Sequence, residues 1–219
     1  MINSERLVTF INSLDRGNDE VLDIIENEAL EASVPIIRKE TQSLLRTLTE
    51  LKRPKTILEA GTAVGFSAIL MAKSGRRDSL VTTIENYEVR IPKAKANIKL
   101  AGLEDRISLL EGDAVKIMEE LAGPFDMIFL DSAKGQYINM LPCAIRLLSP
   151  GGLLISDNVL QDGDVLESRY AVRRRDRTIH ARMRDYLYEL THNESLETAI
   201  LPVGDGITIS VKVNEKENI

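Results

Sequence analysis

Two segments of the sequence place acidic and amide side chains at the end of an apolar run. Asp131 follows the run 125–130, and Asp157 and Asn158 follow the run 152–156. If these runs are neighbouring strands, their ends lie about 5 Å apart, so that two carboxylates and an amide oxygen converge on one point. Such a cluster is costly unless a cation occupies it, and hard oxygen ligands favour Mg²⁺ over Zn²⁺. The structural alternative is that Asp131 caps a turn and the Asp157-Asn158 pair forms one.

Three further segments carry glycines or acids where strands are expected to end. Gly61 and Gly65 allow a tight turn before a helix start, but their G-x-x-x-G spacing differs from the G-x-G-x-x-G of dinucleotide sites, which disfavours a nicotinamide cofactor. Glu85 can accept hydrogen bonds from the two hydroxyls of a ribose, and Asp113 can meet the amino group of an adenine. Taken singly, each acid is better explained as a helix N-cap. Together these segments suit an adenosine that carries a small tail.

The positions of these side chains depend on alternating strands and helices. Helical periodicity predicts a helix over 21–32, and Pro35 is expected to open the next one, through Leu48. The continuous apolar runs that follow are typical of parallel strands buried on both faces. We therefore predict an α/β fold with a doubly wound, mostly parallel sheet that ends in an antiparallel hairpin. The expected strands are 56–58, 80–84, 107–110, 127–130 and 153–155, and the expected hairpin joins 198–201 to 207–213.

Composition narrows the class of protein. The 219 residues include one cysteine and two histidines, too few for a zinc cage of Cys and His ligands. The apolar runs are far shorter than the roughly 20 residues that a membrane-spanning helix needs. The first six residues show no secretory signal, so a cytoplasmic protein is expected. The formal net charge of −6 argues against a uniformly basic nucleic-acid-binding surface.

A local basic segment departs from this acidic balance. The window 169–184 holds seven arginines and one acid, Asp176, which gives it a net charge of +6 in a chain whose total is −6. A helix over 172–190 would leave Arg173, Arg174, Arg177 and Arg184 facing outward and would bury a stripe of apolar residues. That stripe comprises Ile179, Met183, Tyr186, Leu187 and Leu190. Outward arginines are often only a solvated face, but arginine also suits bidentate contacts to phosphate.

The segments 131–137, 156–160 and 202–207 together resemble the cation-dependent O-methyltransferases, the group that contains catechol and caffeoyl-CoA O-methyltransferases. The resemblance spans roughly residues 34–213. It implies a class I methyltransferase fold, Rossmann-like, with a seven-stranded sheet. It also implies a single S-adenosylmethionine-dependent domain over 1–219, with N-terminal helices in 1–52 and the core in 53–213.

The resemblance further implies roles for individual residues. Lys134 matches the family's catalytic lysine, beside Asp131, and Asp131, Asp157 and Asn158 match the ligands of Mg²⁺ or a similar divalent cation. Positions that contact the S-adenosylmethionine cofactor are matched by Glu59, Gly61, Ser67, Glu85, Asp113, Ala114 and Asp131. Ala60 stands where the family usually carries a bulkier apolar residue, a difference that should affect packing more than chemistry.

Within this group the chain is most similar to bacterial tRNA 5-hydroxyuridine methyltransferases, on segments 34–36 and 58–65 and on the arginine run. This implies methylation of 5-hydroxyuridine at the wobble position of the tRNA anticodon loop to give 5-methoxyuridine, with Arg173, Arg174 and Arg175 contacting RNA phosphates, and a homodimer. The alternatives are an O-methyltransferase of small catechol-like or CoA-linked phenols, and a non-enzymatic nucleotide-sensing module.

Overall fold

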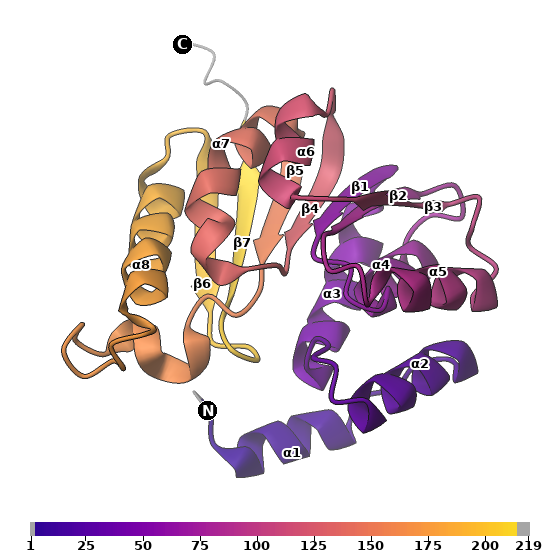
Figure 1. Cartoon of the computed structure of the whole chain (residues 1–219), viewed down its shortest axis with the longest axis horizontal. Helices are drawn as coiled ribbons and strands as arrows, with labels where there is room; N and C mark the ends of the chain where they lie inside the picture. Colours follow the sequence, from indigo (N-terminus) through magenta and orange to yellow (C-terminus); the bar gives the residue numbers. More distant parts are fainter. Residues whose placement is uncertain (1–2, 214–219) are drawn as a thin grey trace.

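The computed structural model describes residues 3–213 and contains a seven-stranded sheet in the order β3-β2-β1-β4-β5-β7-β6 (Figure 1). The first five strands in sequence run parallel, whereas β7 is antiparallel to both β5 and β6. The strands are β1 Thr56–Ala60, β2 Leu80–Glu85, β3 Ile107–Glu111, β4 Phe125–Leu130, β5 Leu148–Ser156, β6 Leu196–Leu201 and β7 Ile207–Lys212. The predicted fold, including its antiparallel hairpin, is confirmed. The ends of the predicted domain, 1–2 and 214–219, lie outside the described residues.

Helices cover both faces of the sheet. The α-helices are α1 Glu5–Ser13, α2 Glu20–Glu31, α3 Lys39–Lys52, α4 Phe66–Ser74, α5 Ile91–Leu100, α6 Ala114–Glu120, α7 Tyr137–Leu147 and α8 Arg177–His192. Two short 3-10 helices, η1 Lys134–Gln136 and η2 Gln161–Leu166, follow β4 and β5. In Figure 1, α3, α4 and α5 lie on one side of the sheet and α6, α7 and α8 on the other. No helix within 3–213 combines the length and the apolar character needed to cross a bilayer.

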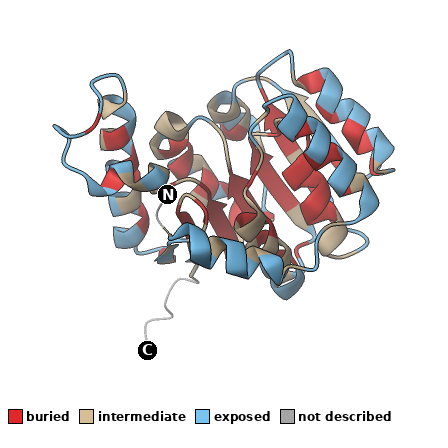
Figure 2. Cartoon of the chain, turned by 90° about the horizontal axis from the view of Figure 1, so that it is seen from below, coloured by how far each residue is buried: buried red, intermediate tan, exposed pale blue. Residues whose placement is uncertain are grey.

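Alternate residues of each central strand enter different hydrophobic cores. In β4, Met127 and Phe129 pack with helices α2 to α4, whereas Ile128 and Leu130 pack with α7 and α8. Buried strands therefore occupy the middle of the molecule, with exposed helix faces outside (Figure 2). Burial on both faces explains why the strands appear in the sequence as continuous apolar runs and not as alternating patterns.

The strand order reverses between β1 and β4, which places the carboxyl ends of both strands beside a shared crevice. The backbone N–H of Asp131 donates to the carbonyl of Ala60 at 2.9 Å, so the residues that follow β1 and β4 start from adjacent positions. This is the edge of the sheet where the sequence predicts a ligand site.

Two predicted helix starts are wrong. Helix α3 begins at Lys39 and not at Pro35, because Arg38 is extended (ψ 156°) and ends a non-helical segment, 34–38. Helix α8 begins at Arg177 and not at Val172, because Val172 is buried at 4% exposure and is followed by a turn in which Asp176 N–H donates to the Arg173 carbonyl. Ile179, which was predicted to be buried on this helix, is 39% exposed.

Candidate active site

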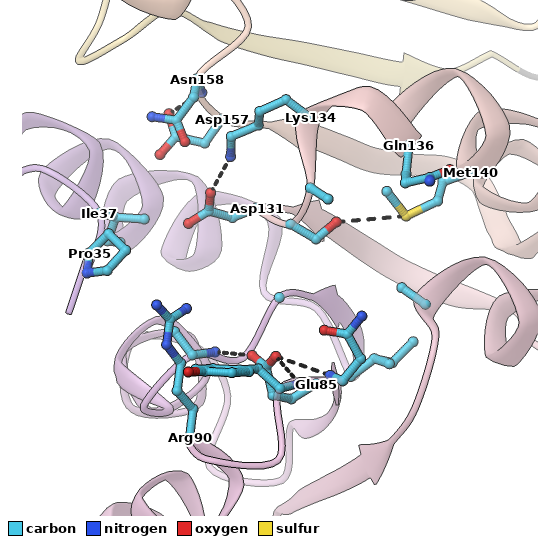
Figure 3. Close-up of a pocket in the computed structure, with 18 of the residues that line it drawn as sticks. Pro35, Ile37, Glu85, Arg90, Asp131, Lys134, Gln136, Met140, Asp157 and Asn158 are labelled. Carbon is cyan, nitrogen blue, oxygen red and sulfur yellow. Dashed lines mark hydrogen bonds and ion pairs between the residues drawn. The ribbon is translucent and has the colours of Figure 1, made fainter. Parts of the chain in front are cut away.

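A cavity of about 560 Å³ opens at the carboxyl ends of the parallel strands. Figure 3 shows its side chains arriving from the loops after β2, β4 and β5 and from the segment before α3. The predicted site residues that line it are Gly61, Glu85, Asp113, Ala114, Asp131, Lys134, Asp157 and Asn158. The structure thus brings together most of the residues that the sequence singled out.

Asp131 and Asp157 lie side by side because β4 and β5 are parallel neighbours, with Leu130 opposite Ser156. Asp157 is only 2% exposed, and its pKa is raised to about 7, first by burial and then by the carboxylate of Asp131. Asn158 adopts a positive φ of 57°, and its backbone N–H donates to Asp157 Oδ1 at 2.7 Å. The neighbouring strand ends thus bring Asp131, Asp157 and Asn158 to the same part of the cavity wall.

Lys134 stands at the start of η1 and reaches back over β4. Its Nζ donates to Asp131 Oδ1 at 2.7 Å and to the Tyr137 hydroxyl at 3.1 Å. That hydroxyl is buried and lies 2.8 Å from the Leu130 carbonyl, to which it donates. Burial, with the charges of Asp131 and Asp157, raises the pKa of Tyr137 well above its ordinary value, so the hydroxyl stays protonated. Tyr137 lies within the segment 131–137, but no role was predicted for it.

The donor set fits a hard divalent cation. Asp157 is buried beside the Asp131 carboxylate, whose charge raises the pKa of Asp157, and the positive charge of Lys134 offsets this rise only in part. Within residues 3–213, no three His, Cys, Asp and Glu side chains gather into a metal-binding group, so the predicted set depends on the amide oxygen of Asn158 as its third ligand. Carboxylate and amide oxygens are ligands suited to Mg²⁺.

The loops after β1 and β2 form the predicted cofactor side of the cavity. Glu85 accepts hydrogen bonds from the backbone N–H groups of Ala63 at 2.7 Å, Asn86 at 3.0 Å and Tyr87 at 2.8 Å (Figure 3). These bonds fix its carboxylate at the cavity wall. Gly61 has a φ of 105°, and a Cβ there would lie 2.2 Å from the Asp131 carbonyl oxygen, so only glycine fits this approach.

Asp113 is both a helix cap and a residue of the cavity wall. Its side chain accepts from the Lys116 backbone N–H at 3.1 Å, which caps α6, and it also lines the cavity beside Ala114. The cap holds the carboxylate at the rim, where one oxygen remains available to a ligand.

Glu59 and Ser67 are buried next to the cavity and do not line it. Glu59 is fully buried on β1, its Oε2 accepts a hydrogen bond from the Thr83 hydroxyl, and its pKa is raised to about 7 by burial. Ser67, 6% exposed on α4, lies close enough to the Glu59 carboxyl to oppose this rise in its pKa. Glu59 Oε1 has no partner, which leaves a buried acceptor next to the cofactor side.

The arginine run lies outside the cavity. Arg173, Arg174 and Arg175 are exposed in the turn before α8 and do not line the cavity. The run is nevertheless joined to the site, because Arg182 Nη1 donates to the carbonyl of Gly135, next to Lys134, at 3.2 Å.

The segment before α3 forms a cavity wall that was not predicted from the sequence. Pro35, Ile36, Ile37 and Arg38 all line the cavity, opposite Lys134 (Figure 3). Arg38 Nη2 lies 2.7 Å from Asp205 Oδ1, in the turn between β6 and β7. An extended segment has no periodicity, so the only available signal was the family likeness at 34–36.

Comparison with known proteins assigns the family. Residues 18–213 match the model of an O-methyltransferase family. A catechol O-methyltransferase of Niastella koreensis is 37% identical over 164 residues, which are 72% of this chain and 74% of that protein. The chain belongs to this O-methyltransferase family. The predicted family is confirmed. An O-methyltransferase is neither a nucleotide-sensing module nor a nicotinamide-dependent enzyme, so the assignment argues against both alternatives.

Solved structures agree with this assignment. A Staphylococcus aureus protein, described provisionally as a caffeoyl-CoA O-methyltransferase, superposes with a TM-score of 0.88 at 31% identity, covering 95% of this chain and all of that one. The O-methyltransferase of tomaymycin synthesis from Streptomyces achromogenes, solved in complex with SAM, shares the fold with a TM-score of 0.84 at 24% identity, covering 98% of this chain and 100% of that one. The fold of this chain is therefore the fold that these O-methyltransferases share.

Proposed function

We propose that this O-methyltransferase methylates 5-hydroxyuridine at the wobble position of the tRNA anticodon loop to give 5-methoxyuridine, with S-adenosylmethionine as methyl donor and Mg²⁺ or a similar cation. The observation that carries the proposal is the position of the seven-arginine window, 169–184. It is held against η1, next to Lys134, by the bond from Arg182 to Gly135. Cationic side chains thus lie beside the cavity in a chain that is acidic overall.

The acceptor must present two adjacent oxygens to the predicted cation site. In 5-hydroxyuridine the hydroxyl on C5 lies beside the carbonyl on C4, just as the two hydroxyls of a catechol adjoin each other. A divalent cation bound by Asp131, Asp157 and Asn158 would fix such a pair and lower the pKa of the hydroxyl. One site can therefore serve a modified base or a small phenol, and features outside it must decide between them.

The side chains of this protein supply alignment and proton transfer. Methyl transfer from a sulfonium is an in-line displacement, so the acceptor oxygen must be placed in line with the methyl group. Lys134, which matches the family's catalytic lysine, is the proposed acceptor of the hydroxyl proton, and the Tyr137 hydroxyl, 3.1 Å from its Nζ, holds the amine in place. Glu85 holds the ribose of the donor on the opposite side of the cavity.

Surface features beside the arginines support an RNA acceptor. Tyr170 is 86% exposed, with the guanidinium of Arg177 6.0 Å from its ring centre. An exposed aromatic ring among arginines suits an RNA loop, whose bases stack on rings while its phosphates pair with guanidinium groups. Arg173, Arg174 and Arg175 are exposed and do not line the cavity, and they are the proposed contacts to the phosphates.

The second candidate is methylation of small catechol-like or CoA-linked phenols. It is favoured by the relative named as a catechol O-methyltransferase, at 37% identity. In this case the arginines would bind the phosphates of CoA.

A methyl-acceptor assay separates the two candidates. The full chain is incubated with labelled S-adenosylmethionine, Mg²⁺ and either tRNA from cells lacking the enzyme, catechol or caffeoyl-CoA. The expected result is label in tRNA, recovered as 5-methoxyuridine after nucleoside digestion. Labelling of the phenols with none in tRNA would refute the tRNA proposal and support the second candidate.

A further inference from the structure

A third carboxylate, Asp205, lies beside the predicted cation ligand Asn158. The amide Nδ2 of Asn158 lies 3.4 Å from Asp205 Oδ2, to which it donates. The backbone supports this contact, because Val159 N–H donates to the Gly206 carbonyl and Leu160 N–H to the Asp205 carbonyl, both at 2.9 Å. The β6–β7 turn therefore holds the chain that follows β5, both through its backbone and through one side chain.

The other oxygen of Asp205 is bound by Arg38. Arg38 Nη2 lies 2.7 Å from Asp205 Oδ1 and 3.2 Å from Asp162 Oδ1. Arg38 is the last residue of the cavity wall 35–38. A continuous series of side-chain contacts therefore joins that wall to Asp205 and then to Asn158. Asp205 lines the cavity, but the family likeness assigned no role to it or to Arg38.

The contact with Asp205 selects the orientation of the Asn158 amide. An amide has a donor NH₂ on one branch and an acceptor oxygen on the other, and a cation binds only the oxygen. A carboxylate accepts hydrogen bonds, so it draws the NH₂ toward Asp205 and leaves the oxygen for the side of Asp157. Figure 3 shows Asn158 next to Asp157 and Lys134.

We propose that Asp205 and Arg38 are positioning residues that orient the Asn158 amide for the divalent cation and couple cation binding to the cavity wall 35–38. The inference rests on the proposed cation site and does not depend on which acceptor is used. Partners that orient metal ligands typically contribute about 10- to 100-fold to metal affinity.

Asp205→Asn tests the inference directly. Asn is neutral and has a single acceptor oxygen, so the variant loses the ion pair with Arg38 and weakens the hold on the Asn158 amide. The Kd of the full chain for Mn²⁺, measured from the electron paramagnetic resonance signal of free Mn²⁺, should rise about 10- to 100-fold. The Kd for S-adenosylhomocysteine, measured by calorimetry, should stay within about twofold, because this product binds on the Glu85 side of the cavity.

Two further variants separate positioning from a general loss of structure. Arg38→Ala leaves Asp205 in place without its partner and should raise the Kd for Mn²⁺ several-fold, which keeps the test valid if Asp205→Asn folds poorly. Asp164→Asn is the matched control, because Asp164 is an exposed carboxylate of the same 3-10 helix, η2, and does not line the cavity. It should keep the wild-type Kd for Mn²⁺.

Asp131→Ala distinguishes the failure of this inference from failure of the cation site. If Asp131→Ala loses Mn²⁺ while Asp205→Asn and Arg38→Ala bind it as tightly as the wild type, the positioning role is wrong and the cation site stands. If Asp131→Ala binds Mn²⁺ as the wild type does, the cation lies elsewhere and the positioning role is refuted as well.

Discussion

Lys134 holds two polar groups at once, the Asp131 carboxylate and the Tyr137 hydroxyl. Asp131 is among the residues expected to contact the cofactor, whereas Lys134 itself is not. Replacing Lys134 with Met should therefore lower kcat about 10²- to 10⁴-fold and leave the Kd for S-adenosylmethionine within a few-fold, as measured by single-turnover kinetics and calorimetry. Lys99→Met, on the exposed face of α5, is the matched control. Equal losses in kcat and cofactor affinity would contradict a role in proton transfer.

Asp131 and Asp157 allow a test of metal dependence. Alanine at either position should abolish turnover, and a chelator should do the same to the wild type, because the acceptor hydroxyl then keeps its ordinary pKa. Circular dichroism should show that the fold is retained. Undiminished turnover in excess chelator, with either acceptor, would remove the basis for the cation site.

Glu59 predicts an unusual dependence of stability on pH. Burial raises its pKa from 4.5 to about 7, so the folded state holds this proton more tightly than the unfolded state does. Its contribution to stability is fully present below pH 4.5 and is lost as the pH rises through about 7. Glu59→Gln should remove this loss, which is on the order of 3 kcal/mol in the free energy of unfolding.

Urea denaturation of the protein without cofactor at pH 5 and pH 8 measures this effect. The variant should gain stability relative to the wild type between the two pH values. If the free energies of unfolding of variant and wild type differ by the same amount at both pH values, Glu59 is already ionised in the folded protein.

At the scale of elements, the turn before α8 carries the proposed RNA contacts. Changing Arg173, Arg174 and Arg175 to Glu should weaken tRNA binding at least tenfold and reduce the slope of log K against log salt, because phosphate contacts release counterions. Filter binding at several salt concentrations measures both quantities. Any activity toward catechol should persist, since none of the three residues lines the cavity.

A second charge reversal controls for net charge. Arg53, Lys55 and Arg77 are exposed at the opposite edge of the sheet, beside the first residues of β1 and β2. Their change to Glu alters the total charge equally and should leave the salt slope unchanged. Identical effects of the two triple variants would indicate nonspecific attraction and no docking by the turn.

The sequence predicts the features that follow from the burial of whole strands, and it misses those that depend on individual side-chain contacts. The central strands could be recognised because both sheet faces are buried, and Asp131 and Asp157 meet because their strands are neighbours. The start of α8 could not be predicted, because Val172 is buried by tertiary packing and so continues the apolar pattern, although it precedes the helix. The ion pair between Arg38 and Asp205 could not be predicted either, because it joins two distant segments that lack a helical or strand periodicity.

At the scale of the whole molecule, α1 leaves an apolar surface exposed. Leu7, Phe10, Ile11 and Leu14 are between 47% and 69% exposed, and no residue of α1 is buried. We expect this surface to meet a second copy of the chain in the homodimer implied by the family likeness. Phe10→Asp with Leu14→Asp should give a monomer in analytical ultracentrifugation, whereas Thr9→Asp, at an exposed polar position of α1, should not. A wild-type monomer at micromolar concentration would contradict the expectation.

The contact at Gly61 bears on how this enzyme can change. Because no Cβ fits between that glycine and the Asp131 carbonyl, the donor loop and the acidic strand end behave as one rigid part. New acceptor preferences, in evolution or in the laboratory, therefore have little freedom there. Variation can instead accumulate in the wall 35–38 and around the arginine turn, which lets a family with one fixed chemistry diversify the molecules it modifies.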